Sequence, residues 1–566
     1  MADNSSNDLA SVIKRRGFIW PSFEMYGGVA GMYDYGPLGC ALKNNIIEMW
    51  RSIYKGREGF VEIDSETVNP REVFKASGHL DNFADLITYC SKCQAPFRAD
   101  HLVKDFYDNP DVLTPKQLEE AFVKHNIKCP DCGGDLGPVE EFNLMFRTNI
   151  GPGNARVGYM RPETAQGIFV NYANLYRYNR DKLPMGVIQT GRSYRNEIAP
   201  RQGMIRMREF NQMEVELFVD PEDKDWVRFP EIENGTLDLI PNTTLELTTM
   251  TVKEAVEKKV IANRVLAYFV YTTKQLLLSL GIDEKRLRFR EHEMDEMAHY
   301  AADCWDAEVL LSYGWTEIVG IADRGNWDLS RHAQFSGQDL THFKKYDEPR
   351  ETEVERINPN SKALGPMYKG KAKAISEAIS ALPPSAIVDG KLKVTVDGEE
   401  IELGSEFFEV VKRKEKVSGE RVIPHVIEPS HGLDRIFYSI LEHAYSYDPE
   451  KDYVVLKLAP AVAPIKVGVF PLMEKDGLDT MAKEIYEKVH TSRVEAYYDG
   501  SGTIGKRYAR MDEVGTPWCI TVDYDSLENG TVTIRDRDST EQKRIPASEV
   551  PAIVDALLAG KPFAEL

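Results

Sequence analysis

The apolar positions near the N-terminus follow a helical repeat. They are spaced by four, three and four residues, which places their side chains on one face of an α-helix; they are Leu42, Ile46, Met49 and Ile53. Residues 60–68 then form a run typical of a strand, and Pro70 follows it. This part of the sequence predicts a helix followed by a strand.

A repeat of two residues marks a hairpin farther along the chain. Residues 187–197 and 205–218 are strand-like and flank a loop with Pro200 and Gly203. One face of the second strand is mostly apolar, and the other carries Arg206, Arg208, Phe210, Gln212, Glu214 and Glu216. A solvated antiparallel strand can have such a polar face, but arginine can also bind phosphate and phenylalanine can stack on a base. We favour a nucleotide site.

Later segments predict further helices and strands. Thr251 and Glu254 form a capping box that opens helical sequence up to about Gly281. A strand at 422–430 precedes a helix at 432–445. After a linker at 460–464, strands and helices alternate, which predicts an α/β domain of about 100 residues. The strands are expected at 465–472, 494–498, 517–523 and 531–536, and the helices at 479–489 and 550–558.

Composition narrows the class of protein. The 566 residues are 42% hydrophobic and 28% charged, as in globular proteins of several domains. The most apolar window, residues 453–472, contains two lysines and three prolines and is not expected to cross a membrane. The N-terminus lacks an apolar signal segment, which predicts a cytoplasmic protein. A net charge of −20 argues against indiscriminate binding to DNA but permits a local RNA-binding surface.

Four of the seven cysteines form two Cys-x-x-Cys pairs, Cys90 with Cys93 and Cys129 with Cys132. Two such pairs can close a tetrahedral zinc site, and four thiolates leave no open position for catalysis. We therefore expect a structural Zn²⁺ ion. His101 and His125 are less favoured ligands, and four unrelated thiols remain an alternative. The other cysteines, which are expected in the core, are Cys40, Cys304 and Cys519.

Three more segments place acidic residues and arginine together near predicted strand ends. They are Arg161-Pro-Glu163-Thr-Ala-Gln166-Gly, Glu317 with Asp323-Arg324, and Glu428-Pro-Ser430-His-Gly-Leu-Asp434-Arg435. Each alone could be a structural ion pair, but their shared chemistry favours one site. No Gly-x-x-x-x-Gly-Lys-Ser/Thr loop occurs, which excludes a P-loop ATPase.

These segments resemble the motifs of a known family. The predicted helix and strand that end at Pro70 are similar to motif 1 of the class II aminoacyl-tRNA synthetases. Residues 191–210 are similar to motif 2 of this family, and Gly432-Leu-Asp-Arg435 is similar to motif 3. The fragments Arg161-Pro-Glu-Thr-Ala-Gln-Gly, Arg195-Asn-Glu-Ile and Val426-Ile-Glu-Pro-Ser more narrowly resemble the glycyl-tRNA synthetases of the homodimeric, archaeal and eukaryotic type. The resemblance covers nearly the whole chain.

The resemblance implies a role for each matching residue. For ATP, it implies Arg195 on the α-phosphate, Glu197 on the adenine amino group, Phe210 stacked on adenine and Arg435 on the γ-phosphate, with Asn196, Arg206, Met207, Glu317, Ile318 and Arg324 completing the site. The implied catalytic residues are Arg195, Glu197 and Arg435. The implied glycine-binding residues are Glu163, Glu214, Glu428, Pro429 and Ser430. Glu317 and Glu428 would hold Mg²⁺ against the triphosphate.

The resemblance also implies an α/β (α+β) fold. A catalytic domain built on an antiparallel sheet, with an inserted zinc module and helical insertions, would precede a C-terminal α/β anticodon-binding domain. The expected parts are 1–85 with motif 1, a zinc insertion at 86–142, a core at 143–344 with motif 2 and a helical insertion at about 220–290, a second insertion at 345–420 that contacts the tRNA acceptor, a core at 421–459 with motif 3, and the anticodon-binding domain at 460–566.

The implied activity is the attachment of glycine to tRNA(Gly) by a homodimer that uses ATP. A class II synthetase for another small amino acid and a non-catalytic tRNA-binding paralogue are the alternatives. The second alternative is disfavoured because Arg195, Glu197 and Arg435 are all present.

Overall fold

The computed structural model describes residues 8–107, 109–153, 156–200, 202–293 and 302–566. Residues 1–7, part of the N-terminal segment from which a cytoplasmic location was expected, lie outside the described residues. The chain divides into two units, one made of residues 1–340 and 423–566 and the other of residues 341–422. No helix in the described ranges combines the length and apolar composition needed to cross a membrane.

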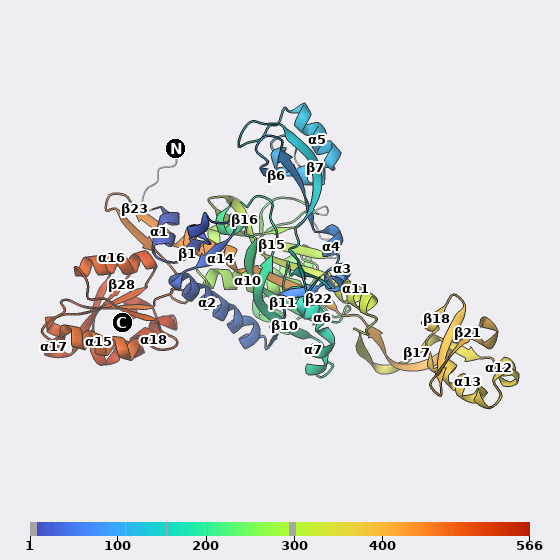
Figure 1. Ribbon diagram of the computed structural model, residues 1–566. Helices are drawn as coiled ribbons and strands as arrows, with labels where there is room; N and C mark the ends of the chain where they lie inside the picture. Colours follow the sequence, from blue (N-terminus) through green and yellow to red (C-terminus); the bar gives the residue numbers. More distant parts are fainter. Residues whose placement is uncertain (1–7, 108, 154–155, 201, 294–301) are drawn as a thin grey trace. The chain divides into compact units, whose positions relative to one another are not determined.

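Within the described part of the larger unit, nine strands form one sheet in the order β13-β12-β14-β15-β16-β22-β11-β10-β3. Its strands are β13 (Thr248–Thr251), β12 (Thr236–Ile240), β14 (Leu287–Glu291), β15 (Asp303–Leu311), β16 (Gly314–Gly325), β22 (His425–Gly432), β11 (Glu209–Val219), β10 (Met185–Tyr194) and β3 (Val61–Glu62). The β12–β14 and β10–β3 pairs are parallel, and the other pairs are antiparallel. Figure 1 shows β10 and β11 side by side at the centre of this unit.

Helices α10 (Arg264–Ser279) and α14 (Leu433–Ala444) pack against the sheet, and α6 (Ala165–Val170) also contacts β10 and β11. The apolar side chains of α10 and α14 join one core with Met213, Val215 and Leu217 of β11, while Glu214 and Glu216 alternate with these residues. Because successive side chains of a strand point to opposite faces, one face of the sheet is apolar and the other carries buried polar groups. The two predicted faces are confirmed within β11, but the strand expected from residue 205 begins only at Glu209, after a 3-10 turn at Gly203–Ile205.

The predicted N-terminal helix is present, but the strand after it is not. Helix α2 (Pro37–Arg51) buries Leu42, Ile46 and Trp50 and continues into a π-helical turn (Ser52–Arg57). The single strand expected at 60–68 was wrong. Strand β3 pairs with β10, whereas β4 (Val68–Pro70) pairs with β9 (Val157–Met160) in another sheet. The intervening residues Asp64-Ser65-Glu66 are polar and cannot continue one buried strand.

The helical sequence expected from Thr251 to Gly281 is interrupted. The capping box of Thr251 and Glu254 is confirmed and opens α9 (Val252–Glu257). Helix α10 begins only at Arg264, where Asn263 caps it, because Lys259 between the two helices has a positive φ of 57°. Residues 220–290, expected as a helical insertion, also contribute β12, β13 and β14 to the main sheet.

Two smaller parts of this unit have sheets of their own. The cysteine-rich part contains β5 (Ala84–Cys90), β6 (Pro96–Arg98), β7 (Leu136–Asn143) and α5 (Pro115–Lys124). The C-terminal part has a sheet in the order β26-β25-β27-β28-β29. Its strands and helices are β25 (Val467–Pro471), α15 (Leu478–Val489), β26 (Ala496–Tyr498), α16 (Ile504–Val514), β27 (Trp518–Val522), α17 (Tyr524–Asn529), β28 (Thr531–Asp536), β29 (Gln542–Pro546) and α18 (Val550–Leu558). Helices α16 and α17 and strand β29 were not anticipated from the sequence.

The remaining described elements of the larger unit are short. They are α1 (Leu9–Arg15), β1 (Ile19–Pro21), β2 (Tyr33–Tyr35), α3 (Arg71–Ala76), α4 (His79–Asn82), β8 (Arg147–Asn149), α7 (Tyr172–Tyr178), α8 (Phe229–Ile232), α11 (Trp327–Ser336), β23 (Tyr445–Asp448) and β24 (Tyr453–Leu456).

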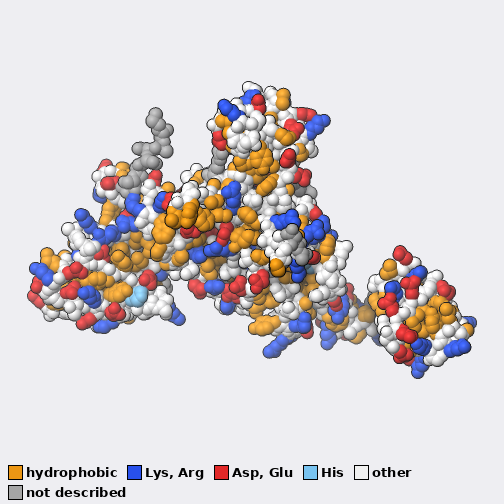
Figure 2. Space-filling view, viewed as in Figure 1, with side chains coloured by type: hydrophobic (Ala, Val, Ile, Leu, Met, Phe, Trp, Pro, Cys, Tyr) orange, Lys and Arg blue, Asp and Glu red, His pale blue; other side chains and the backbone are white. Residues whose placement is uncertain are grey.

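The smaller unit has its own core. Strands β17 (His342–Pro359) and β21 (Phe408–Val422) form a long antiparallel ladder. Helices α12 (Ser361–Tyr368) and α13 (Ala372–Ala381) and the strands β18 (Ile387–Val388), β19 (Lys391–Val396) and β20 (Glu399–Leu403) complete the unit. Ile357, Ile375 and Leu392 are buried together. In the space-filling view, acidic and basic side chains are interspersed over its surface (Figure 2).

Candidate active site

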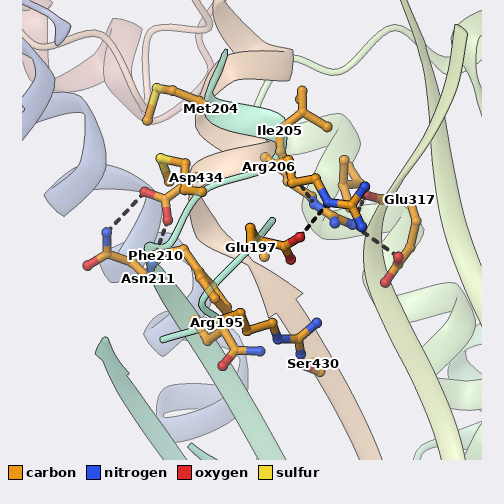
Figure 3. A pocket seen from close by; sticks show the side chains of 15 residues that line it. Arg195, Glu197, Met204, Ile205, Arg206, Phe210, Asn211, Glu317, Ser430 and Asp434 are labelled. Carbon is orange, nitrogen blue, oxygen red and sulfur yellow. Dashed lines mark hydrogen bonds and ion pairs between the residues drawn. The ribbon is translucent and has the colours of Figure 1, made fainter. Parts of the chain in front are cut away.

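The polar face of the main sheet carries a pocket between the β10–β11 hairpin, β16 and the start of α14 (Figure 3). It is lined by Arg195, Glu197, Met204, Ile205, Arg206, Met207, Phe210, Asn211, Gln212, Glu317, Ile318, Ser430, Gly432, Asp434 and Arg435. The structure therefore brings together eight of the residues expected at ATP, namely Arg195, Glu197, Arg206, Met207, Phe210, Glu317, Ile318 and Arg435. Asn196 and Arg324 are not among the lining residues.

Three guanidinium groups surround the pocket. Arg195 lies over the Phe210 ring, with its Cζ atom 5.3 Å from the ring centroid. Arg206 Nε is 2.8 Å from a carboxylate oxygen of Glu197. Figure 3 shows this ion pair in the middle of the pocket. Guanidinium groups can bind phosphate through paired N–H donors, so the pocket suits a polyphosphate.

A second ion pair lies at the β16 side of the pocket, between Arg435 and Glu317. Arg435 Nη1 donates to the backbone oxygen of Glu317 at 2.8 Å and lies 3.0 Å from a carboxylate oxygen of the same residue. This contact fixes the side chain of Arg435 across the strand that carries Ile318. The arginine expected at the γ-phosphate is thus held at the edge of the pocket.

Asp434 fixes the beginning of α14 to strand β11. Its carboxylate accepts hydrogen bonds from the backbone N–H of Asn211, from Asn211 Nδ2 at 3.0 Å and from the hydroxyl of Tyr35. Burial raises the pKa of Asp434, while these hydrogen bonds oppose the shift. Because Arg435 is the next residue, the network positions its side chain over the sheet.

A second group of charged residues is buried next to the pocket. Arg324 Nη1 donates to a Glu428 oxygen at 2.7 Å, and Arg324 Nε donates to Asp328 at 2.9 Å. Arg324 Nη2 is also 3.8 Å from a carboxylate oxygen of Glu163. Glu214 accepts hydrogen bonds from Ser430 Oγ at 2.9 Å and from the hydroxyl of Thr164. Strand pairing sets this contact, because Glu214 and Ser430 are directly opposed on β11 and β22.

Carboxylates outnumber cations in this buried group. Burial alone would raise the pKa of Glu163, but His79 and Arg324 outweigh it and lower the pKa. Burial and the Glu163 charge raise the pKa of Glu214. Burial also raises the pKa of Glu428 to about 8, although Arg324 opposes this shift. A buried excess of carboxylate favours a bound cation such as an ammonium group.

The structure separates some residues that were expected to act together. Arg324, expected at ATP, lies with the buried carboxylates. Glu317 and Glu428, expected to share Mg²⁺, have different partners, Arg435 and Arg324. The carboxylates close enough to Glu428 to hold one cation with it are Glu214 and Glu216, both buried.

Other residues of the site were not singled out as site residues from the sequence. Gln166 Nε2 donates to Glu163 at 2.8 Å and to Asp328 at 2.9 Å, and its Oε1 lies 2.8 Å from His332 Nε2. Thr164 binds Glu214. Thr164 and Gln166 stand in the Arg161–Gly167 fragment, which could have indicated them, whereas Asp328 and His332 had no comparable local signal.

The four paired cysteines meet in the cysteine-rich part. The Sγ atoms of Cys90 and Cys132 are 3.5 Å apart, and those of Cys93 and Cys129 are 3.6 Å apart. Zinc–sulfur bonds of about 2.3 Å in a tetrahedron place the sulfur atoms about 3.8 Å apart. The four thiols are therefore compatible with one zinc ion. In the described part of the chain, neither His101 nor His125 belongs to this group.

The other three cysteines were expected in the core, and this prediction is confirmed only in part. Cys519 is buried, Cys304 is half-buried and Cys40 is exposed. The expected core position of Cys40 was wrong. The buried face of α2 is formed by Gly39, Leu42, Ile46 and Trp50. Cys40 follows Gly39 directly, so its side chain points away from this buried face.

A largely antiparallel sheet, a β10–β11 hairpin that carries arginines and an arginine in the first turn of the helix after β22 define a class II aminoacyl-tRNA synthetase. Comparison supports this class directly. Residues 150–259 match the tRNA synthetase class II core domain (G, H, P, S and T), and residues 466–557 match the anticodon binding domain. The fold is also similar to that of prolyl-tRNA synthetase from Giardia lamblia, with a TM-score of 0.53 at 14% identity over 97% of this chain and 79% of that one.

Relatives that match over nearly their full length indicate which family of class II synthetases the chain belongs to. The chain is 50% identical to the glycine–tRNA ligase of Methanothrix thermoacetophila over 98% of this chain and 97% of the relative. It is 49% identical to the enzyme of that name from Methanocaldococcus jannaschii over 96% and 97% of the two chains. The chain belongs to the glycine–tRNA ligase family.

Proposed function

We propose that the chain joins glycine to ATP, forming glycyl-adenylate and pyrophosphate, and then transfers glycine to the 3′ end of tRNA(Gly). The observation that carries this proposal is the buried group of Glu163, Glu214, Arg324 and Glu428 beside a pocket lined by arginines. The carboxylates suit the ammonium group of a small amino acid, and the arginines suit a triphosphate. The family membership of the chain supports the same reaction.

In the first step, a carboxylate oxygen of glycine attacks the α-phosphorus of ATP. The bond from that phosphorus to the oxygen shared with the β-phosphate breaks, and pyrophosphate leaves. Such a reaction depends mainly on positioning and on neutralising charge. We assign the α-phosphate to Arg195 and the γ-phosphate to Arg435, because both side chains line the pocket.

The adenine base is assigned to the ring of Phe210 and the carboxylate of Glu197, with Arg206, the backbone of Met207 and Ile318 completing the pocket. Arg206 is paired with Glu197, so it can orient that carboxylate. Asn196 adjoins these residues in sequence. We retain it in the ATP site.

Magnesium, when bound, neutralises charge on the triphosphate. Glu317 is the carboxylate of the pocket that we assign to it, with Glu428 as the second expected ligand. Glu317 already contacts Arg435, which places a carboxylate next to the arginine assigned to the γ-phosphate.

Glycine is assigned to the buried group, with its ammonium against Glu163, Glu214 and Glu428 and with Pro429 and Ser430 beside it. Arg324 belongs to this group and offers a cation for the glycine carboxylate. Every competing amino acid is larger than glycine, so a closely packed site can exclude them sterically, whereas rejecting a substrate that is smaller by one methylene gains only about 1–3 kcal/mol.

In the second step, a hydroxyl of the terminal ribose attacks the carbonyl carbon of glycyl-adenylate, AMP leaves and the hydroxyl proton passes to solvent. We assign the tRNA anticodon to the C-terminal part, residues 460–566, which contains the anticodon binding domain match. The acceptor end is assigned to residues 345–420. The other expected boundaries, 1–85, 86–142, 143–344 and 421–459, are retained in this proposal.

We also propose a homodimer in the cytoplasm. The dimer rests on the resemblance of the segment ending at Pro70 to motif 1, and sedimentation velocity tests it. The cytoplasmic location is supported by seven cysteines that are all free thiols, as expected in a reducing compartment.

The reaction is tested by exchange of labelled pyrophosphate into ATP with glycine, alanine or serine, followed by charging of a tRNA(Gly) transcript. We expect exchange with glycine and at least about 100-fold lower kcat/KM with alanine and serine, a difference of about 2.7 kcal/mol. If only alanine or serine supported exchange, that amino acid and not glycine would be the substrate. Absence of exchange with every amino acid would favour a non-catalytic paralogue.

A further inference from the structure

A second group of metal-binding side chains lies outside the pocket and outside the cysteine pairs. His292, Cys304 and Asp306 each offer one ligand atom, and these atoms lie within 4.8 Å of one another. Cys304 and Asp306 belong to β15, and His292 directly follows the end of β14. The group combines nitrogen, sulfur and oxygen donors, which is the donor set of zinc and related transition metals.

Strand pairing places this group on the substrate face of the sheet. His292 N donates to Cys304 O at 3.0 Å, so these residues lie opposite each other. Asp306 is paired with Gly320 of β16, and Gly320 is paired with Ser430 of β22. Paired residues of neighbouring strands point to the same face. Asp306 and Cys304 therefore lie on the same face as Ser430, with strand β16 between them.

The strand between the two groups carries only small side chains at these positions. Gly320 lies between Asp306 and Ser430, and Ala322 lies between Cys304 and Glu428. A Cβ atom at Gly320 would have Asp306 Oδ1 at 3.8 Å and Glu317 Oε1 at 3.9 Å as its nearest neighbours. The space next to Gly320 on this face of the sheet is therefore open, and carboxylate oxygens of Asp306 and Glu317 border it.

The carboxyl groups of Asp306, Glu317 and Glu428 act on the Cys304 thiol. Burial and then the charge of Glu317 raise the pKa of Asp306 to about 6. Burial and the charges of Asp306, Glu317 and Glu428 raise the pKa of the Cys304 thiol well above its usual value. Such an environment strongly favours a divalent cation, which deprotonates a coordinating thiol.

Two cationic groups also face Asp306. Arg290 Nη2 is 3.7 Å away, but Arg290 Nε donates to Glu308 at 3.1 Å. His292 Nε2 is 2.8 Å from Asp306 Oδ2. Burial of the ring alone would lower the pKa of His292, but this carboxylate outweighs it and raises the pKa. A metal ion would therefore bind between His292 and Asp306 in place of the proton that they share.

We propose that His292, Cys304 and Asp306 bind a second divalent transition-metal ion, separate from the ion of the four paired cysteines. Binding forms a metal–sulfur bond at Cys304, and the thiol proton leaves to solvent. Occupancy lowers the rate of adenylate formation, because the ion attracts the Glu317 carboxylate that otherwise pairs with Arg435.

Cobalt titration of the full chain tests the proposal. The protein is first loaded with one zinc ion in the cysteine pairs, checked by elemental analysis, and is then titrated with Co²⁺. We expect one further equivalent to bind with a thiolate-to-cobalt charge-transfer band in the near ultraviolet. Cys304→Ser should abolish the band, and His292→Gln should weaken binding by more than about tenfold, the loss typical of removing even an outer partner of a ligand.

Cys519→Ser is the matched control, because Cys519 is a buried thiol in the C-terminal part; it should keep both the band and the affinity. Near- and far-ultraviolet circular dichroism checks that each variant is folded. If Cys304→Ser does not fold, His292→Gln decides the question by affinity. No second equivalent in the parent, or an unchanged band in a folded Cys304→Ser variant, would overturn the proposal.

The activity readout is independent of cobalt binding. Excess Zn²⁺ should lower glycine-dependent pyrophosphate exchange at least about threefold in the parent and not in Cys304→Ser, a difference of about 0.7 kcal/mol. Metal binding that leaves the exchange rate unchanged would overturn the proposed effect on activity. Because binding is measured without substrate, its outcome is distinct from that of the glycine reaction.

Discussion

Arg324 and Glu428 form a buried ion pair in which Nη1 donates to Oε2 at 2.7 Å. The two residues are 104 positions apart in sequence, and the pairing of β16 with β22 brings them together. The same guanidinium binds Asp328 and approaches Glu163. One arginine therefore faces three carboxylates, and a second cation is needed to balance the charge of the group.

Glycine binding should release a proton from this group. Burial raises the pKa of Glu428 to about 8, although its contact with Arg324 opposes the shift, and we therefore expect this carboxyl to titrate near neutral pH in the empty site. An adjacent ammonium favours the ionised form. We expect KM for glycine to fall as pH rises from about 6.5 to 8.5, by at most about tenfold per pH unit. Exchange kinetics across this range measure the effect.

Glu428→Gln provides the comparison, because glutamine does not titrate. The variant should bind glycine more weakly and lose the slope. If KM for glycine did not depend on pH in the parent, or had the same pH dependence in the variant, the released proton would not come from Glu428.

The folded protein also binds the proton of Glu428 more tightly than the unfolded chain does. The contribution of Glu428 to the unfolding free energy therefore falls as pH rises from about 4.5 to 8.

Arg195→Ala should lower pyrophosphate exchange by about 100- to 1,000-fold, the range found when one donor to a developing charge is removed. The melting temperature should hardly change, because the side chain of Arg195 contacts Phe210 and the backbone of Pro162 rather than a buried carboxylate.

Arg192→Ala is the matched control. Arg192 lies on β10, three residues before Arg195, but its side chain is exposed and pairs with Glu209. Its removal should leave exchange within about threefold of the parent. If Arg195→Ala retained activity within about tenfold, the α-phosphate would have to be assigned to another residue.

Ser430→Ala should affect glycine binding more than turnover. Ser430 Oγ donates to Glu214 at 2.9 Å, and a hydrogen bond to a charged group contributes about 1.5–3 kcal/mol. We expect KM for glycine to rise by about 10- to 100-fold, with a smaller change in KM for ATP. Ser439→Ala removes a buried hydroxyl that donates to a backbone oxygen of α14 and serves as the control. Equal effects on both substrates would contradict the assignment.

Cys90→Ser should release zinc from the cysteine pairs. Since a structural zinc ion contributes directly to folding, residues 84–143 should become more sensitive to protease while the remaining parts stay folded. Elemental analysis and limited proteolysis measure both effects. Cys40→Ser changes an exposed thiol and should retain the metal. Full metal content in Cys90→Ser would show that Cys90 is not a ligand.

The sequence predicted the local chemistry of the site better than its long-range pairing. Alternation alone separated Met213 and Val215 from Glu214 and Glu216, because a strand has a fixed repeat of two. The position of Arg324 beside Glu428 could not be predicted in this way, since it depends on which strands are neighbours in the sheet. The ATP-binding role expected for Arg324 came from the family resemblance and stays a prediction.

Some errors came from local signals that were present but not used. Asn263 is a typical capping residue, and it marks the start of α10 after the break at Lys259. The polar residues 64–66 similarly divide the expected strand at 60–68. The exposure of Cys40 could also have been predicted, because Cys40 is two positions from Leu42, which places it on the other side of α2 from the apolar face.

The most direct measurement is a crystal structure of the full chain with a hydrolysis-resistant analogue of glycyl-adenylate. We expect the adenine ring against Phe210, the phosphate mimic beside Arg195 and the ammonium group within hydrogen-bond distance of Glu214. An analogue bound away from the β10–β11 hairpin and β22, or one whose ammonium group faces solvent while the buried carboxylates keep their present partners, would contradict the assignment.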